Sequence, residues 1–207
     1  PNPTLTAGAN TASSETPLES LQGFFRERRY IPTIILVFFL AYMPVITQSF
    51  EALRCSEQPI GGVVYLARDL EVVCGEGLHA TVRPIAILVI LVFGLGFPAL
   101  VFEGLRRNKA RLREPMFASS FGFLYDGYDV ARGLQGWESV ILVRKALVVM
   151  IATVASDPYF QISTALLLIG VSWWLQEFFH PFTDLWSNRM ESLSLGTQFV
   201  TAALSLL

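Results

Sequence analysis

The chain has 207 residues, of which 53% are hydrophobic and only 15% are charged, and its formal net charge is -2. Soluble domains carry about 25% charged residues, so this composition, with a mean hydropathy of +0.50, predicts an integral membrane protein rather than a soluble one. The cations gather in a few connecting segments between long uncharged runs. Nothing in this distribution indicates a nucleic-acid partner, and we expect none.

Residues 1–24 are predicted to be a flexible linker. Their first twenty positions are rich in Pro, Ser, Thr and Ala and show no apolar periodicity, which is typical of segments that bury too little surface to become ordered. The chain begins without Met and stops at Leu207 inside an apolar run. We therefore expect a fragment of a longer protein.

Residues 25–207 are predicted to form an all-α, polytopic membrane bundle. A helix needs about 20 mostly apolar residues to cross the hydrocarbon core. Five segments meet this requirement at least in part, and they cover about 30–50, 84–104, 137–156, 158–177 and 191–207. Pro44 in the first span, and Gly94, Gly96 and Pro98 in the second, are expected to bend their helices.

The distribution of Lys and Arg predicts a cytoplasmic N-terminus, because cytoplasmic flanks carry the excess of cations. With this orientation the outer segments hold only Arg54, Arg68 and Arg83. The inner segments hold Arg26, Arg28, Arg29, Arg106, Arg107, Lys109, Arg111, Arg113, Arg132 and Arg189.

The two cysteines support the same orientation. Cys55 and Cys74 both fall in the loop between the first two spans, which this orientation places outside. An even pair in an oxidising compartment usually forms a disulfide, so we expect a Cys55–Cys74 bond.

The inner loop after the second span has two parts. A basic run is suited to contact with anionic inner-leaflet lipid, although the ordinary positive-inside bias also accounts for it; it contains Arg106, Arg107, Lys109, Arg111 and Arg113. An aromatic segment at 121–128 follows that is too short to span, and we expect it to lie at the membrane interface or to fold back against the bundle.

The third span contains Glu138, Arg144 and Lys145. Glu138 is expected at the inner boundary, with the two cations roughly 10 Å deeper at 1.5 Å per residue. Lys145 shares a helical face with Glu138 and is expected to lean back toward it, whereas Arg144 needs an acid from elsewhere. The candidates are Glu103, Asp126, Asp129, Glu177 and Glu191. Two interpretations stay open: an ion pair that fixes helix packing, or a charge lining an ion or water path.

Enzymatic motifs are absent from the sequence. It has no G-x-S-x-G, H-E-x-x-H or phosphate-binding loop, and His79 and His180 are expected on opposite sides of the membrane. We therefore expect no catalytic residues, metal site or cofactor. The expected partners are membrane lipids, other subunits or further parts of the same chain, in a homo- or hetero-oligomer.

Several motifs together resemble a multi-pass module found near the C-terminus of large cell-surface proteins of algae, ciliates and other protists, distantly similar to the fungal TRP-like, polycystin-related family. The resemblance covers about residues 25–207. It rests on Cys55, Tyr65-Leu66, Asp69-Leu70, Cys74, Gly94, Gly96, Pro98, Arg106-Arg107-Asn108, Gly122-Phe123-Leu124-Tyr125, Tyr128, Trp137-Glu138, Arg144-Lys145 and Glu191.

The resemblance implies a helical bundle in a plasma, ciliary or endomembrane, in a protein involved in cation transport or sensing. The sequence lacks a recognisable selectivity-filter loop between its spans. The rival hypothesis is a membrane anchor or assembly subunit that holds an extracellular or partner structure without conduction.

Overall fold

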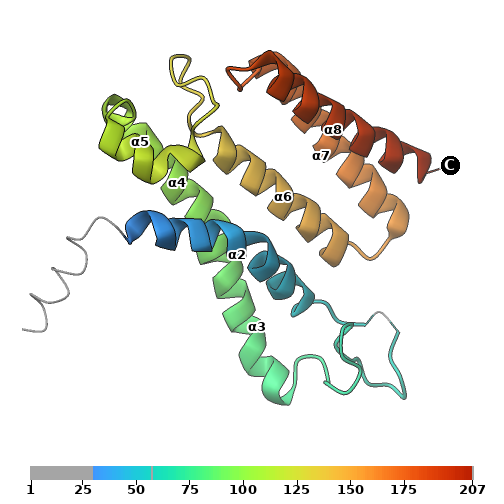
Figure 1. Cartoon of the computed structure of the whole chain (residues 1–207). Helices are drawn as coiled ribbons and strands as arrows, with labels where there is room; N and C mark the ends of the chain where they lie inside the picture. Colours follow the sequence, from blue (N-terminus) through green and yellow to red (C-terminus); the bar gives the residue numbers. More distant parts are fainter. Residues whose placement is uncertain (1–29, 57, 207) are drawn as a thin grey trace, which may run out of the picture.

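A computed structural model describes residues 30–56 and 58–206, and these residues form a helical bundle (Figure 1). The linker expected at 1–24 lies outside the described residues. Within them, β structure is limited to isolated bridges. The all-helical fold class predicted from the sequence is confirmed.

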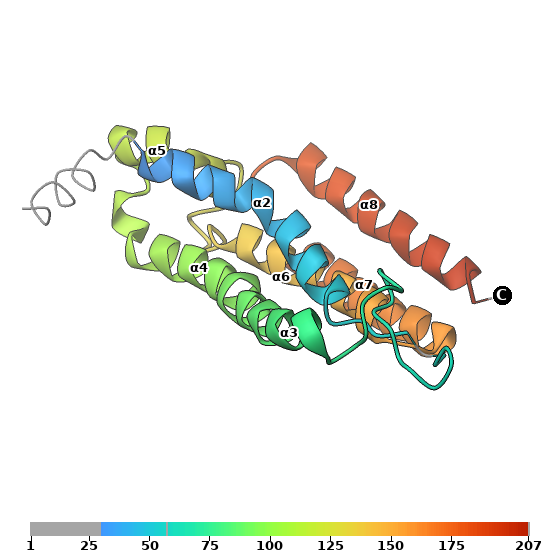
Figure 2. The ribbon, with the colours of Figure 1, turned by 90° about the horizontal axis from the view of Figure 1, so that it is seen from below.

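Five long helical stretches run alternately up and down the molecule (Figures 1 and 2). The helices are α2 (Ile31–Glu51), a continuous stretch of α3 (Gly77–Val89), the π-helix η1 (Ile90–Gly96) and α4 (Phe97–Arg107), then α6 (Trp137–Val154), α7 (Pro158–Phe179) and α8 (Leu185–Leu204). Between α4 and α6 lie the short elements η2 (Lys109–Arg111), α5 (Pro115–Phe121) and η3 (Gly122–Leu124).

Three helical segments of the described chain are long and apolar enough to cross a membrane. These are Ile31–Glu51, Gly77–Arg107 and Pro158–Phe179. The second begins seven residues before the expected residue 84, and α8 begins six residues before the expected residue 191. Both shifts have the same cause. The first turns of these two helices contain polar residues, which hydropathy assigns to loops although they are helical.

α2 packs against the second helical stretch at the π-helix η1. Pro98 lacks the N–H that would donate to the Gly94 carbonyl four residues earlier. That carbonyl instead accepts a hydrogen bond of 2.8 Å from the Tyr42 hydroxyl of α2. A Cβ on Gly94 would lie 3.0 Å from Ile46 Cδ1, so only a glycine allows this approach without a shift. Gly94, Gly96 and Pro98 were expected to bend this helix; the structure shows a π-helix and a close helix contact at these residues.

The buried core lies between α2, α4, α6 and the segment 112–125. Tyr42 and Ile46 are fully buried in it, and Phe93 and Phe97 stack 5.5 Å apart beside Tyr42. In contrast, many large apolar side chains lie exposed on the outer faces, among them Leu40 and Leu167. Such broad apolar exposure is unusual for a soluble monomer and is expected of helices that face lipid.

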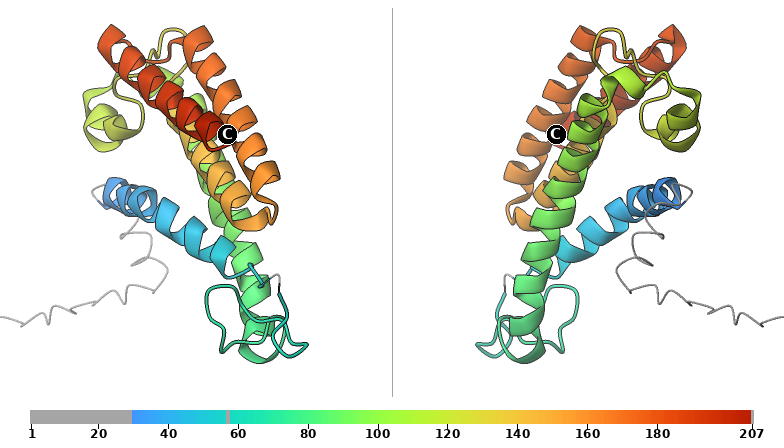
Figure 3. Two further views of the ribbon diagram at one scale, coloured as in Figure 1. Left: turned by 90° about the vertical axis from the view of Figure 1, so that its right-hand side faces the viewer. Right: turned by 90° about the vertical axis from the view of Figure 1, so that its left-hand side faces the viewer.

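The loop 52–76 closes one end of the bundle (Figure 3). A disulfide joins Cys55 to Cys74, as the sequence predicts. His79 ties the loop to α3: Gly75 N donates to its Nδ1 over 2.8 Å, and its Nε2 lies 2.9 Å from the Ala52 carbonyl. Because Nδ1 accepts, Nε2 is the donor to the carbonyl, so both ring nitrogens are used in these contacts and the role of His79 is structural.

Candidate functional site

The charged and polar side chains of interest gather at the end of the bundle opposite the disulfide loop. Here the segment 122–136, the turn 180–184 and the first turns of α6 and α8 meet (Figures 1 and 3). We call Tyr128, Glu138, Arg144 and Glu191 the charge cluster. They come from the 122–136 segment, α6 and α8.

Arg144 pairs with Glu191 across the bundle. Its Nη2 donates to Glu191 Oε1 over 2.7 Å, and the two side chains retain 17% and 25% of their exposure. Charge-assisted contacts of this length are among the stronger hydrogen bonds in proteins. The pair therefore connects α6 to α8, two helices whose contact is otherwise made mainly through α7.

The other four candidate acids are engaged elsewhere or exposed. Glu103 pairs with Arg106 and Arg107 of its own helix, at 2.9 and 2.7 Å. Glu177 lies 3.9 Å from His180 and accepts from Ser192. Asp129 accepts from the backbone of Arg132 over 3.1 Å, and Asp126 is exposed.

The expected approach of Lys145 to Glu138 is not seen. Glu138 Oε2 instead accepts a 2.5 Å hydrogen bond from the Tyr128 hydroxyl. Lys145 is exposed, and no acid among residues 30–56 and 58–206 lies within ion-pair distance of it. Two helical turns separate Glu138 from Lys145, whereas the folded-back segment 122–136 brings Tyr128 directly to Glu138. A tertiary contact thus replaces the expected contact along the helix.

Tyr128 is buried between two helix ends. It stacks on Phe182 with ring centroids 4.8 Å apart. Burial raises the pKa of its hydroxyl well above the ordinary value, and the hydrogen bond to Glu138 and the negative charges of Glu138 and Glu191 raise it further, against the opposing effect of Arg144. Tyr128 is therefore a neutral donor to a carboxylate at any physiological pH.

Backbone hydrogen bonds join the segment 122–136 to the turn after α7. Asp129 N donates to Pro181 O over 2.8 Å, and Thr183 N donates to Gly127 O over 2.9 Å. Arg132 adds a contact of 3.4 Å to the carbonyl of His180, which ends α7 in the left-handed region at φ 43°. The placement of Tyr128 is thus fixed from both sides.

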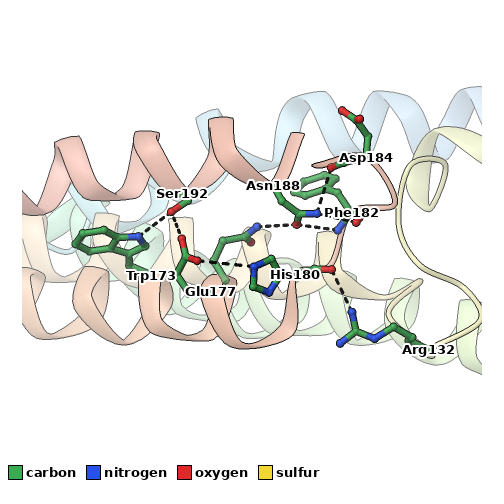
Figure 4. Close-up of polar contacts among 9 residues, drawn as sticks. Arg132, Trp173, Glu177, His180, Phe182, Asp184, Asn188 and Ser192 are labelled. Atoms are coloured by element: carbon green, nitrogen blue, oxygen red, sulfur yellow. Dashed lines mark hydrogen bonds and ion pairs between the residues drawn. The ribbon is translucent and has the colours of Figure 1, made fainter. Parts of the chain in front are cut away.

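A polar network links α7 to the start of α8 (Figure 4). Asn188 is its centre: Nδ2 donates to Phe182 O over 2.7 Å, while Oδ1 accepts from Phe182 N over 3.1 Å and from Gln176 over 3.3 Å. One turn further along, Trp173 Nε1 donates over 2.9 Å to Ser192, which donates to Glu177. These bonds satisfy polar groups that would be costly to bury alone.

The residues that carry the family resemblance mostly have packing roles. Leu124 and Tyr125 are buried, and the Tyr125 hydroxyl donates to Leu112 O over 2.8 Å. Gly122, Phe123 and Leu124 form η3, with Phe123 half exposed. Trp137 begins α6 and packs against Phe179 at 5.6 Å.

The basic run lies on the surface at this same end. Arg106 and Arg107 share Glu103, and Arg111 lies 3.5 Å from Glu114. Lys109 and Arg113 are exposed. The guanidinium groups are held near the helix end but stay accessible, so anionic groups of the surroundings can reach them.

The arrangement supports structural tasks better than chemical ones. Each member of the charge cluster has a partner within it, and no group of three metal-binding side chains occurs among the described residues. Sequence reasoning missed the Tyr128–Glu138 bond and the Asn188 network. The only sequence signal for them is the presence of polar side chains at Gln176, Asn188 and Ser192 beside the helix ends.

Comparison with known proteins yields a distant likeness. The chain is 26% identical over 135 residues to the cysteine repeat modular protein A of Toxoplasma gondii. The match covers 62% of this chain and 4% of that protein, so the chain corresponds to a small part of its length. No family model matches the chain, and no solved structure matches it.

Proposed function

We propose that the chain is a five-crossing membrane module that anchors and assembles a larger protein, with its N-terminus and the charge cluster on the cytoplasmic side. The ion pair between Arg144 and Glu191 carries this proposal. Arg144 is the most deeply placed charge that has a partner, and that partner is an acid of the same chain. A charge that served an ion path would be expected to face a water-filled space. The sequence alone ranks cation transport ahead of membrane anchoring, and this ion pair reverses that ranking.

The five-crossing topology is supported by the alternating directions of the helices. Among the described residues, the cations of the charge-cluster end outnumber those of the disulfide end, where only Arg54, Arg68 and Arg83 occur. The positive-inside rule assigns the first end to the cytoplasm. The disulfide then lies on the oxidising side, where such bonds persist.

α6 and α8 are the two crossings that apolar length alone does not identify. α6 has Glu138, Arg144 and Lys145, and α8 has Arg189 and Glu191. The ion pair offsets the cost of two of these charges, and an exposed Lys145 can extend its ammonium group toward the nearer interface. Membrane insertion of both helices is therefore compatible with their charges.

The likeness to a very long protein named for cysteine repeats is consistent with a module that occupies one small part of a larger assembly. We propose the same for this chain, with a plasma or ciliary membrane as the location. The anchor is then non-enzymatic and contributes no conduction of its own.

Cation transport in a TRP-like protein is the second candidate, and the outer face of α8 favours it. Thr197, Gln198 and Thr201 form an exposed polar stripe on a helix that we place in the membrane. Their hydroxyls donate to carbonyls of the same helix at 2.8 Å, but the Gln198 amide needs further partners. Several copies arranged around this stripe could line a path.

A flux assay separates the two candidates. The full chain, reconstituted in liposomes, is expected to give no more cation flux than empty liposomes, while a soluble protein fused to its N-terminus stays with the membrane after alkaline extraction. Flux above the control that is lost in Thr197→Val with Gln198→Leu, at equal protein content, would refute the anchor and support transport. Leu193→Val on the same helix is the matched control.

A further inference from the structure

A second site lies between the first half of α2, the helix α4, and α5 with η3. It is a crevice of about 410 Å³, within the roughly 300–1,000 Å³ typical of ligand pockets. Val101, Leu105 and Leu124 form its buried floor, and the exposed Phe38 and Leu100 form its rim. Asn108 is its one polar lining residue.

The wall of the crevice fits a hydrocarbon chain better than a peptide. A peptide brings backbone N–H and C=O groups that need partners in an apolar site. The Asn108 side chain is the one polar group on the wall, and its Nδ2 already donates to Gly104 O over 2.8 Å. An acyl chain needs no such partner.

Gly104 keeps the crevice open. A Cβ built on this residue meets no atom within 4 Å, which shows free space beside the backbone. Because Gly104 belongs to the crevice lining, a larger side chain there would extend into that space. The position therefore offers a way to fill the crevice alone.

Positive charge lies at the end of the crevice where Gly104 and Asn108 are found. Arg107 follows Gly104 by one helical turn and so lies toward the crevice side of α4. Its side chain is 77% exposed while its Nε contacts Glu103 at 2.7 Å. From Glu103 to Glu114 the sequence has five cations and two acids, an excess of three positive charges.

We propose that this crevice holds one acyl chain of an anionic phospholipid from the cytoplasmic leaflet, with the phosphate of the headgroup bound by Arg107. The proposal rests on the orientation given under the proposed function. It goes beyond general attraction of the basic run to the leaflet, because it assigns a defined cavity and a defined cation. A lipid held there joins α2 to α4 and α5 at their cytoplasmic ends.

The test measures lipid retained by the purified full chain, using phosphatidylglycerol and phosphatidylcholine as probes and native mass spectrometry as the readout. Gly104→Phe is expected to remove retention of both lipids. Arg107→Gln is expected to weaken phosphatidylglycerol about fivefold, the factor that corresponds to about 1 kcal/mol per cation near the surface. It is expected to weaken phosphatidylcholine less, because the choline cation offsets the charge of the same phosphate. Leu91→Phe, at an exposed apolar position of η1, and Arg113→Gln are the matched controls.

Each result decides for or against the site. Should Gly104→Phe fail to fold, Leu100→Gln at the exposed rim replaces it, with the same expected loss. Equal retention in Gly104→Phe and Leu91→Phe would overturn the proposal. Binding that occurs only after residues 1–25 are deleted would also overturn it, since the occupant would then be the chain's own segment. If no lipid is retained while the two chain termini lie on opposite sides of the membrane, this proposal alone is refuted. If the two termini lie on the same side, the proposed function is refuted.

Discussion

The ion pair between Arg144 and Glu191 makes the most specific energetic prediction. Exposed ion pairs contribute about 0–1 kcal/mol, and removing one partner of a fully buried pair costs about 3–5 kcal/mol. The two side chains are 17% and 25% exposed, so we expect a coupling free energy of about 2 kcal/mol between these limits. For a chain of this size, that corresponds to about 4–8 °C in Tm.

A double-mutant cycle in lipid nanodiscs measures this coupling. Arg144→Met and Glu191→Gln should each lower the Tm, and the double variant should lose less than the sum of the two. Lys145→Met is the matched control, because Lys145 is an exposed cation next to Arg144 on the same helix, and its Tm should change little. Additive single effects, or a Lys145→Met variant as damaged as Arg144→Met, would refute the assignment of Glu191 as the partner.

Three further predictions concern the two ends of the bundle. Tyr128→Phe should cost about 1.5–3 kcal/mol of unfolding free energy through loss of a bond to a charged acceptor, measured by denaturant titration. Because the folded-state pKa of Tyr128 is raised above 10.0, its contribution is fully present below pH 10 and is lost as pH rises further; an unchanged alkaline fall in Tyr128→Phe would contradict this. Asn188→Ala should cost about 1–3 kcal/mol, while Ser187→Ala, at the neighbouring half-buried position, should cost less; equal losses would argue against the Asn188 network. Cys55→Ser with Cys74→Ser should cost about 3 kcal/mol and abolish the mobility difference between reduced and oxidised protein on a gel, and a native chain that shows no such difference would contradict the disulfide.

The helical fold follows from the sequence, because long uncharged runs admit few alternatives. Segment 31–51 matches its expected range to within one residue at each end. α8 begins six residues before its predicted start, because Asp184 caps the helix by accepting a hydrogen bond from Ser187 N over 3.0 Å. Hydropathy does not detect such a cap, although Asp before a helical run is a recognised signal.

The charge cluster was predictable only in part. Periodicity along α6 separates Arg144 from Glu138 and leaves five acids as candidates, because a sequence pattern states which face a side chain occupies and not which helix lies opposite. Glu191 is the partner because α7 and α8 pack antiparallel and bring the second turn of α8 beside Arg144. Periodicity also suggested a Glu138–Lys145 contact, which the folding back of Tyr128 replaces.

The crevice beside α4 had no signal in the sequence. Gly104 occurs among apolar and basic residues, and only the structure shows that the space beside it is open. The aromatic segment 121–128 was expected to lie at the interface or to fold back against the bundle. Its Phe121 and Leu124, together with the preceding Phe117, line one side of the crevice. Whether a short aromatic segment packs down or leaves a gap depends on the tertiary arrangement of its neighbours.

The membrane sidedness of the two chain ends tests the central claim most directly. Single cysteines placed before Leu21 and after Leu206, in a Cys55→Ser, Cys74→Ser background, are labelled in intact cells with a membrane-impermeant maleimide. The five-crossing module predicts that the C-terminal cysteine is labelled from outside and the N-terminal one only after permeabilisation. Labelling of both ends from the same side would contradict it.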